Sequence, residues 1–190
     1  MKKIILGFLS IIFVGQIAMA QPVSDHAVIP MAITVQSVLR LNVKSGGNIE
    51  FVFSTINSIT NGIANTAAYN TTFDVAATQN WDVFIGTDNA NFVSDEGATL
   101  TIAHVSLFVD GVGINAARTS TPFGAAGVLV QGPTPLLEWV GGAPNTNVGN
   151  AVLNAFTIHW ASGVAPATTM VGTAPGRYAV NVYLSLVAAN

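Results

Sequence analysis

The sequence predicts an all-β protein, an antiparallel β-sandwich of the immunoglobulin-like or jelly-roll kind. Three observations predict it. Apolar and polar residues alternate at period two along most of the chain, Asn-Gly, Gly-Gly and Pro-Asn turns separate these stretches, and outside the N-terminal leader no convincing helical period is kept. Short strands joined by turns are typical of antiparallel sandwiches. We therefore expect a single β-sandwich domain after an N-terminal signal peptide.

The first twenty residues have the pattern of a secretory signal peptide. Lys2-Lys3 is followed by an apolar run, Ile4–Val14, and by the small-residue cleavage pattern Ala18-Met19-Ala20. The apolar run is shorter than the about 20 residues that a membrane-spanning helix needs. We expect residues 1–20 to be removed, the mature protein to begin at Gln21, and its destination to be the extracellular space or the bacterial cell surface, without membrane insertion.

The composition is poor in charge and in cysteine. Charged residues make up 8% of the chain, against about 25% in an average domain, and hydrophobic residues make up 51%. Disorder is excluded by the apolar content, and the net charge of −3, which becomes −5 without the two leader lysines, argues against a nucleic-acid partner. With no cysteine, packing and backbone pairing must supply the stability. A surface so poor in charge is hard to keep monomeric, so we expect other copies of the chain to cover part of it.

Period-two alternation predicts the individual strands. The C-terminal strand follows the turn Ala174-Pro175-Gly176, with Tyr178, Val180, Val182, Leu184 and Leu186 on one face. In Trp81–Ile85 the first, third and fifth residues point inward, and in Leu153–Trp160 the inward residues are Phe156, Ile158 and Trp160. Further strands are predicted at Ile49–Phe53, Thr72–Val75, Thr99–Val109, Val128–Val130 and Leu136–Val140.

An unusually long alternating segment precedes these strands. From Ala27 to Lys44 every odd position holds an apolar residue, except Ser37. Fully extended, this segment would span about 60 Å, whereas ordinary strands have about 3–10 residues. Either it bends between two sheets or part of it leaves the domain. We therefore divide the mature chain into an extended segment, residues 21–37, that is a possible donor strand, and a β-sandwich domain, residues 38–190.

The polar residues form no recognisable catalytic motif. His26, His104 and His159 stand apart from the few carboxylates, and His159 alternates with inward residues, so it should face solvent or a neighbouring strand. We expect no enzymatic activity and no cofactor. Oxygen ligands for Ca²⁺ are available at Asp88, Asp95 and Glu96 with Asn89 and Asn91, but Asx residues are also good turn formers, and the spacing matches no known metal loop.

One aromatic residue is a candidate for ligand binding. Trp139, between Glu138 and Gly141-Gly142, has the broad apolar face on which sugars stack, although a core Trp at a strand end explains the same pattern. The region from Asp110 to Asn150 is rich in Gly, Pro, Ala and Asn, and long loops of this kind are often functional. It is therefore the place where a glycan or protein ligand would bind.

The order of several motifs resembles bacterial secreted β-sandwich domains of the pilin-like, spore-coat-U-like and WxL-like kind. The motifs are Asn80-Trp81-Asp82-Val83, an acid-and-Asn turn with Phe92, Thr99-Leu100-Thr101-Ile102, and Pro175-Gly176-Arg177-Tyr178 before a terminal strand. The chain lacks the cysteine pair found in many pilins. The resemblance implies a fibre, coat or adhesive role and supplies no catalytic residues.

Two functions follow as expectations. In the first, the chain is a secreted subunit of an extracellular fibre, pilus-like filament or surface coat. Part of Val23–Val35 leaves its own domain and completes the sheet of a neighbour, with Ile29, Met31, Ile33 and Val35 at the subunit interface. In the second, it is a monomeric cell-surface adhesin or glycan-binding module, and the long segment bends between two sheets of one domain.

Overall fold

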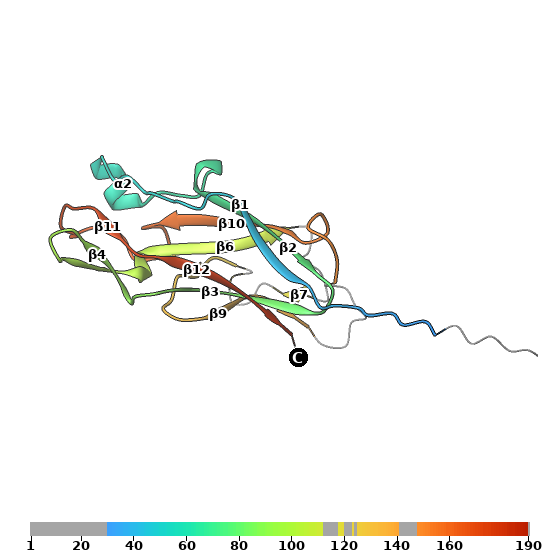
Figure 1. The fold of residues 1–190 in the computed structure, drawn as a ribbon. Helices are drawn as coiled ribbons and strands as arrows, with labels where there is room; N and C mark the ends of the chain where they lie inside the picture. Colours follow the sequence, from blue (N-terminus) through green and yellow to red (C-terminus); the bar gives the residue numbers. More distant parts are fainter. Residues whose placement is uncertain (1–29, 112–117, 120–122, 124, 141–147, 190) are drawn as a thin grey trace, which may run out of the picture. The chain divides into compact units, whose positions relative to one another are not determined.

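The structure is a computed structural model that describes residues 30–111, 118–119, 123, 125–140 and 148–189. The chain consists of two units, Met1–Val35 and Gln36–Asn190. All strands described lie in the second unit, and they form antiparallel sheets packed as a sandwich (Figure 1). The predicted fold class, an all-β antiparallel β-sandwich, is confirmed.

The larger sheet has five strands in the order β1-β2-β10-β6-β8. Their bounds are Leu39–Ser45 for β1, Asn70–Ala77 for β2, Ala155–Ser162 for β10, Val105–Gly111 for β6 and Gly127–Val128 for β8. Side chains alternate between the core and the outer face along β10, as the period-two pattern predicts. Phe156, Ile158 and Trp160 are buried, which confirms their predicted orientation.

The second sheet has four strands in the order β12-β3-β9-β7. Their bounds are Val182–Ala188 for β12, Trp81–Thr87 for β3, Thr134–Trp139 for β9 and Arg118–Thr119 for β7. Trp81, Val83 and Ile85 are fully buried, as predicted. The register shifts between Val83 and Phe84, which pair with Leu137 and Pro135. The extra residue between these partners is a β-bulge, and it lets two consecutive leucines of β9 be buried.

Short elements cover one end of the sandwich (Figure 1). A three-stranded sheet has the order β11-β4-β5, with bounds Tyr178–Ala179, Asn91–Ser94 and Thr99–Thr101. The helical pieces are α2 (Ile56–Asn61) and two 3-10 turns, η1 (Ala67–Tyr69) and η2 (Ile102–His104). Across the part of the chain that the structure describes, no helix has the length and apolar character needed to cross a bilayer.

Aromatic residues from both sheets meet in the core. The ring of Phe156 stacks on Phe73 at a centroid distance of 5.3 Å, and Trp81 of the other sheet meets Phe156 edge-on at 6.0 Å. Such offset and edge-on pairs add to the stabilisation from burial. Around them pack the buried aliphatic side chains of both sheets, among them Val75, Val83, Ile85, Val105, Leu107, Val109, Leu129, Leu136, Leu137 and Ile158.

Two predicted strands are interrupted where the chain passes from one sheet into another, and a hydrogen bond holds the chain at each break. The predicted strand Thr99–Val109 divides into β5, the turn η2 and β6, and the Thr101 hydroxyl accepts from the backbone N–H of Ala103 to cap that turn. The C-terminal strand divides into β11 and β12, which belong to different sheets. At the break, Asn181 donates from its backbone and its side chain to the carboxylate of Asp88.

Two further expectations are wrong. The segment Ile49–Phe53 forms no strand, although Ile49 and Phe51 pack against the core and Phe51 stacks on Tyr69 at 4.6 Å. Alternation there reflects a half-buried face without strand pairing. A short helix, α2, was not expected; its N-terminus is capped by the Thr55 hydroxyl, which accepts from the Ser58 N–H. In the long segment Ala27–Lys44 a strand begins at Leu39, and residues 30–38 belong to no strand or helix.

Candidate functional site

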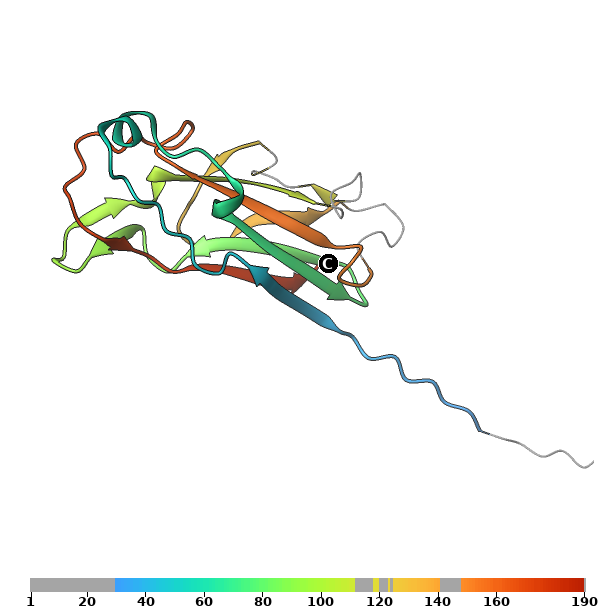
Figure 2. The ribbon, with the colours of Figure 1, turned by 90° about the horizontal axis from the view of Figure 1, so that it is seen from above.

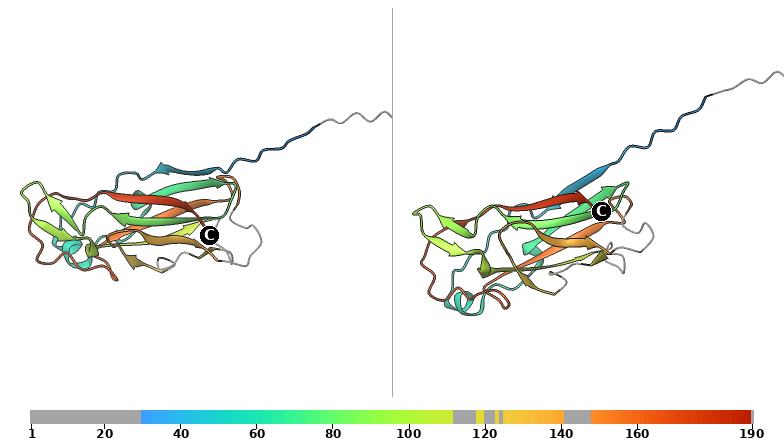
Figure 3. Two further views of the ribbon diagram at one scale, coloured as in Figure 1. Left: turned by 60° about the horizontal axis from the view of Figure 1, so that its bottom comes forward. Right: turned by 90° about the horizontal axis from the view of Figure 1, so that it is seen from below.

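The most distinctive surface of the sandwich is the side on which both large sheets end, formed by β1 and β12 and here called the β1/β12 side. β1 is the last strand of the five-stranded sheet, and β12 is the last strand of the four-stranded sheet. The two strands contact each other across the layers without joining one sheet, and Figures 2 and 3 show them side by side. Within the described residues, no strand pairs with the outer edge of either one.

Leucines of both strands lie half-buried along the β1/β12 side. Leu39 and Leu41 of β1 and Leu184 and Leu186 of β12 pack against the core without being fully covered. Elsewhere in the sheets, the inward residues of β3 and β10 are almost completely buried. The core is therefore less well covered here than at the centre of the sandwich, and an added apolar element would gain contact area.

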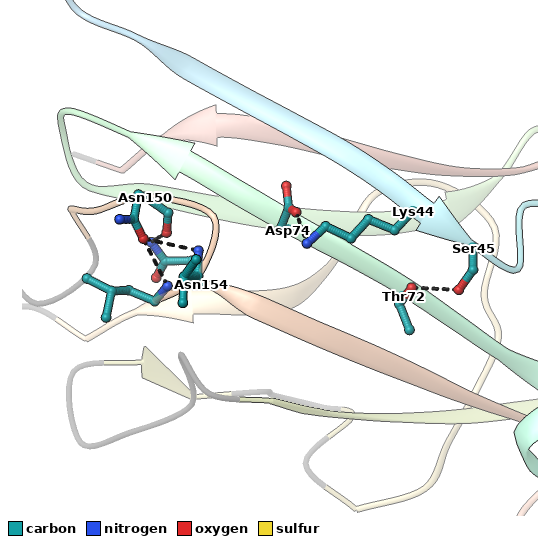
Figure 4. Close-up of polar contacts among 8 residues, drawn as sticks. Lys44, Ser45, Thr72, Asp74, Asn150 and Asn154 are labelled. Atoms are coloured by element: carbon teal, nitrogen blue, oxygen red, sulfur yellow. Dashed lines mark hydrogen bonds and ion pairs between the residues drawn. The ribbon is translucent and has the colours of Figure 1, made fainter.

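The two edges differ in charge. β1 carries Arg40 and Lys44, and Lys44 Nζ lies 2.6 Å from Asp74 Oδ2 on β2 (Figure 4). In the same view, the hydroxyls of Ser45 and Thr72 lie 2.6 Å apart, so both contacts tie β1 to β2. Charged residues on an edge strand disfavour pairing with another chain. β12 has the sequence Val-Tyr-Leu-Ser-Leu-Val-Ala, with no charge and no proline, so it lacks this protection.

The predicted interface residues before β1 are strongly exposed where the structure describes them. Met31 is 85% exposed, and Ile33 and Val35 are each 83% exposed. Ile29, the fourth predicted interface residue, lies outside the described residues. Large apolar side chains at alternate positions of an extended segment form one continuous apolar face.

The carboxylates considered as Ca²⁺ ligands are not brought together. Asp88 precedes β4, while Asp95 and Glu96 follow it, so the four residues of that strand, about 13 Å in length, separate them along the chain. Asp88 accepts from the Asn181 side chain at 2.7 Å, and this hydrogen bond holds the pKa of Asp88 below its usual value. Among the residues that the structure describes, no cluster of three His, Cys, Asp or Glu side chains is placed to hold a metal ion.

Trp139, the candidate sugar-stacking residue, is the final residue of β9 and not part of a loop. Its backbone N–H donates to Asp82 Oδ1 at 2.7 Å, which ties the end of β9 to β3. Its indole Nε1 is buried and has no hydrogen-bond partner among the described residues. The region Asp110–Asn150 in which it lies contains β7, β8 and β9, and residues 112–117, 120–122, 124 and 141–147 of that region lie outside the described part.

The two histidines described lie on or next to the neighbouring strands β10 and β6, and each has its own partners. His159 faces outward on β10, where it stacks on Phe108 at 4.3 Å and its Nε2 lies 3.0 Å from Asp110 Oδ2. His104 ends the turn η2, and its Nδ1 lies 2.9 Å from the carbonyl oxygen of Thr168. The predicted outward position of His159 is confirmed. His26 lies outside the described residues.

A cavity of about 460 Å³, largely open to solvent and lined mostly by exposed residues, lies between β5 with η2 on one side and residues 168–174 with Tyr178 on the other. Sequence reasoning missed it, because its walls come from segments some 70 residues apart along the chain. The available signal was a run of threonines in both segments, Thr99-Leu100-Thr101 and Thr168-Thr169. Threonines in alternating stretches are also ordinary strand residues, so this signal alone does not distinguish a cavity from a surface.

No protein-family model matches the chain, and no curated protein matches it in sequence.

Proposed function

We propose that the protein is a secreted structural subunit of an extracellular fibre, pilus-like filament or surface coat, in which copies are joined by strand exchange. Part of Val23–Val35 of one copy pairs along the outer edge of β12 of the next. The observation that carries this proposal is the character of β12, a seven-residue edge strand with neither charge nor proline. Natural proteins normally protect such an edge, because its unpaired N–H and C=O groups pair readily with another strand.

The segment before β1 has the properties that a donor strand needs. Its residues 30–35 belong to no strand, and Met31, Ile33 and Val35 are exposed at alternate positions. Extended, the thirteen residues from Val23 to Val35 span about 43 Å, whereas the seven residues of β12 span about 23 Å. The donor is therefore long enough to pair with the whole acceptor edge and still connect to its own domain.

Burial at the β1/β12 side explains why such pairing is favourable. The leucines of β1 and β12 are half-buried, so an apolar strand laid beside β12 covers them and buries its own side chains in the same step. Full burial of one aliphatic side chain contributes about 1.5–3 kcal/mol. Because donor and acceptor lie on different parts of the same chain, the contact is head-to-tail, and its repetition gives an open filament.

The composition supports assembly of several copies, and the leader supports a location outside the cytoplasm. A chain with 8% charged residues has little charge repulsion to keep copies apart, and assembly covers part of its surface. The leader pattern of Met1–Ala20 supports export, and its removal places the donor segment at the new N-terminus.

Deletion of Gln21–Val35 from the mature chain tests the proposal. The full mature chain should elute from size-exclusion chromatography as large assemblies that appear as filaments in negative stain. The deletion variant should elute near the monomer mass with the circular dichroism of a β protein. Filaments of the deletion variant that match those of the full chain would contradict the proposal, as would a full chain that stays monomeric at all concentrations.

A charge on the acceptor edge provides a second test that leaves the donor intact. Val187→Lys places a lysine on β12 at a position that is already partly exposed, and Val152→Lys places the same charge on an exposed position outside the strands. The edge lysine should shift the elution from assemblies toward monomer, while the control should assemble as the parent chain does. Equal assembly by both variants would contradict the assignment of β12 as acceptor.

A further inference from the structure

The cavity beside β5 has the size and construction of a small-ligand site. Its volume of about 460 Å³ lies within the range of about 300–1,000 Å³ that is typical of ligand pockets. Its walls come from β5 and η2, from the segment 168–174 and from Tyr178 of β11, at the end of the sandwich that carries β4 and β11 (Figure 1).

Hydrogen bonds hold the two walls in place. The N–H of Thr168 donates to the carbonyl oxygen of Ala103 at 2.9 Å, and the imidazole of His104 contacts the carbonyl oxygen of the same threonine at 2.9 Å. At the other end of the segment, the Tyr178 hydroxyl donates to the carbonyl oxygen of Ala174 at 3.0 Å. A ligand therefore meets a pocket that is formed in advance, which reduces the entropy lost on binding.

The lining is polar but carries no charged side chain. Besides His104 and Tyr178, its polar side chains are five threonines, Thr99, Thr101, Thr168, Thr169 and Thr173, and no Asp, Glu, Lys or Arg is among its residues. Each threonine hydroxyl can both donate and accept a hydrogen bond. A charged ligand would find no opposite charge to compensate its desolvation, so the lining favours a neutral ligand with several hydroxyl groups.

The backbone of β5 adds further donors and acceptors. β5 is the last strand of its sheet. On its β4 side, the carbonyl oxygen of Ala98 accepts from the Ser94 N–H, and the Ile102 N–H donates to the carbonyl oxygen of Ala90. In an antiparallel ladder, residues alternate between facing the partner strand and facing away from it. The N–H and C=O groups of Thr99 and Thr101 therefore point to the free edge, on the side away from β4.

The two ring side chains complete the arrangement. A carbonyl oxygen only accepts hydrogen bonds, so Nδ1 of His104 is the donor in its contact with Thr168. His104 is 8% exposed, and it lines the cavity. The phenol ring of Tyr178 supplies an apolar face of the kind against which the C–H face of a pyranose packs.

We propose that this cavity is a binding site for a neutral saccharide. The hydroxyls of the sugar exchange hydrogen bonds with the threonines and the edge of β5, and its apolar face packs on Tyr178. A peptide strand is disfavoured as occupant because β5 offers only three residues for pairing. The site does not depend on strand exchange, so a chain lacking Gln21–Val35 should bind the same sugars.

A glycan array followed by titration calorimetry tests the proposal on the full mature chain. The array carries neutral glycans ending in glucose, galactose, mannose or N-acetylglucosamine, and matched glycans ending in sialic or glucuronic acid. Neutral glycans should be retained and the acidic ones should not. The hits are then titrated as their soluble methyl glycosides against the parent chain and its variants.

The variant Thr99→Val/Thr169→Val removes two hydroxyls at exposed positions while keeping the β-branched shape, and Thr157→Val on β10 is the matched control. Loss of two hydrogen bonds should weaken binding about tenfold or more, while the control should bind as the parent does. Absence of any neutral hit, a preference for acidic glycans, or equal binding by the double variant would each overturn the proposal.

Discussion

The indole Nε1 of Trp160 donates a hydrogen bond to the hydroxyl of Thr71, 2.9 Å away inside the core. The same hydroxyl donates to the carbonyl oxygen of Gly46 at 2.6 Å. One threonine thus connects β10, β2 and the turn that follows β1. Because a buried N–H without a partner is costly, the core should be sensitive to substitution of this threonine.

Replacing Thr71 by valine should lower the free energy of unfolding by about 1–3 kcal/mol. The shape of the side chain is kept, but Trp160 Nε1 and the Gly46 carbonyl both lose their partner. Urea denaturation followed by tryptophan fluorescence measures the change. Thr71→Ser retains the hydroxyl and should lose less stability, so a serine variant less stable than the valine variant would contradict this account.

The adjacent glycines after β1, Gly46 and Gly47, should differ strongly in their sensitivity to alanine. Gly46 has φ of +69°, and a Cβ there would collide with the backbone of Asn70 and Thr71, whereas a Cβ on Gly47 would meet nothing within 4 Å. Gly46→Ala should therefore destabilise the fold by at least about 2 kcal/mol, because strained backbone and collision add. Gly47→Ala should stay within about 0.5 kcal/mol of the parent. Thermal unfolding of the two variants checks this, and equal midpoints would refute it.

The contact between Asp88 and Asn181 should be visible as a pH-dependent effect. The Asn181 side chain lowers the pKa of Asp88 from its usual value of about 3.9, so the contact stabilises the fold above that pH and its contribution is lost as the pH falls through the lowered pKa. Asn181→Leu should raise the pKa of Asp88 in an NMR titration. It should also reduce the melting temperature more at neutral pH than at pH values below the lowered pKa of Asp88. Asn61→Leu, in α2, serves as control and should leave the titration of Asp88 unchanged.

The alternating face of the donor segment gives a matched pair of variants for assembly. Ile33→Asp places a charge on the apolar face, and Thr34→Asp places the same charge on the opposite face of the extended segment. Burial of an unpaired carboxylate against the leucines of the β1/β12 side is unfavourable, so the first variant should be largely monomeric by analytical ultracentrifugation, and the second should assemble. Loss of assembly in both, or in neither, would exclude a sided donor strand.

The core-facing strands could be predicted well from the sequence, because burial of one face of a strand makes apolar residues alternate with more polar ones. Phe156, Ile158 and Trp160 alternate with more polar residues, and this spacing has no good helical interpretation. Alternation does not reveal pairing, however. Phe51 alternates in the same way and packs on Tyr69, yet its segment finds no strand partner, since pairing depends on distant residues.

The strand interruptions and the cavity could not be predicted from the sequence, because they too depend on contacts between residues that are distant along the chain. The break at Asn181 depends on Asp88, which lies far away along the chain, and the cavity forms only when Thr99 and Thr168 are brought to facing walls. The short helix α2 has a local sequence signal, the capping pair Thr55 and Ser58. Its six residues are too few to show a helical period of apolar residues. The segment proposed as donor is the reverse case, since its alternation is visible in the sequence, whereas the position of β12 at the edge of its sheet is not.

The pairing of β12 with β3 also bears on the order of folding. Trp81–Thr87 meets Val182–Ala188 only after the entire intervening chain has been made, and its other neighbour, β9, is likewise remote in sequence. Sheets built from such distant segments close slowly, because loop entropy is lost before the contacts form. In an emerging chain, β3 therefore pairs with β9 at the earliest and has an open edge on its other side until Val182–Ala188 has been made. For the export proposed above, this delay keeps the polypeptide open during transfer across a membrane, in a state that a holding chaperone can bind.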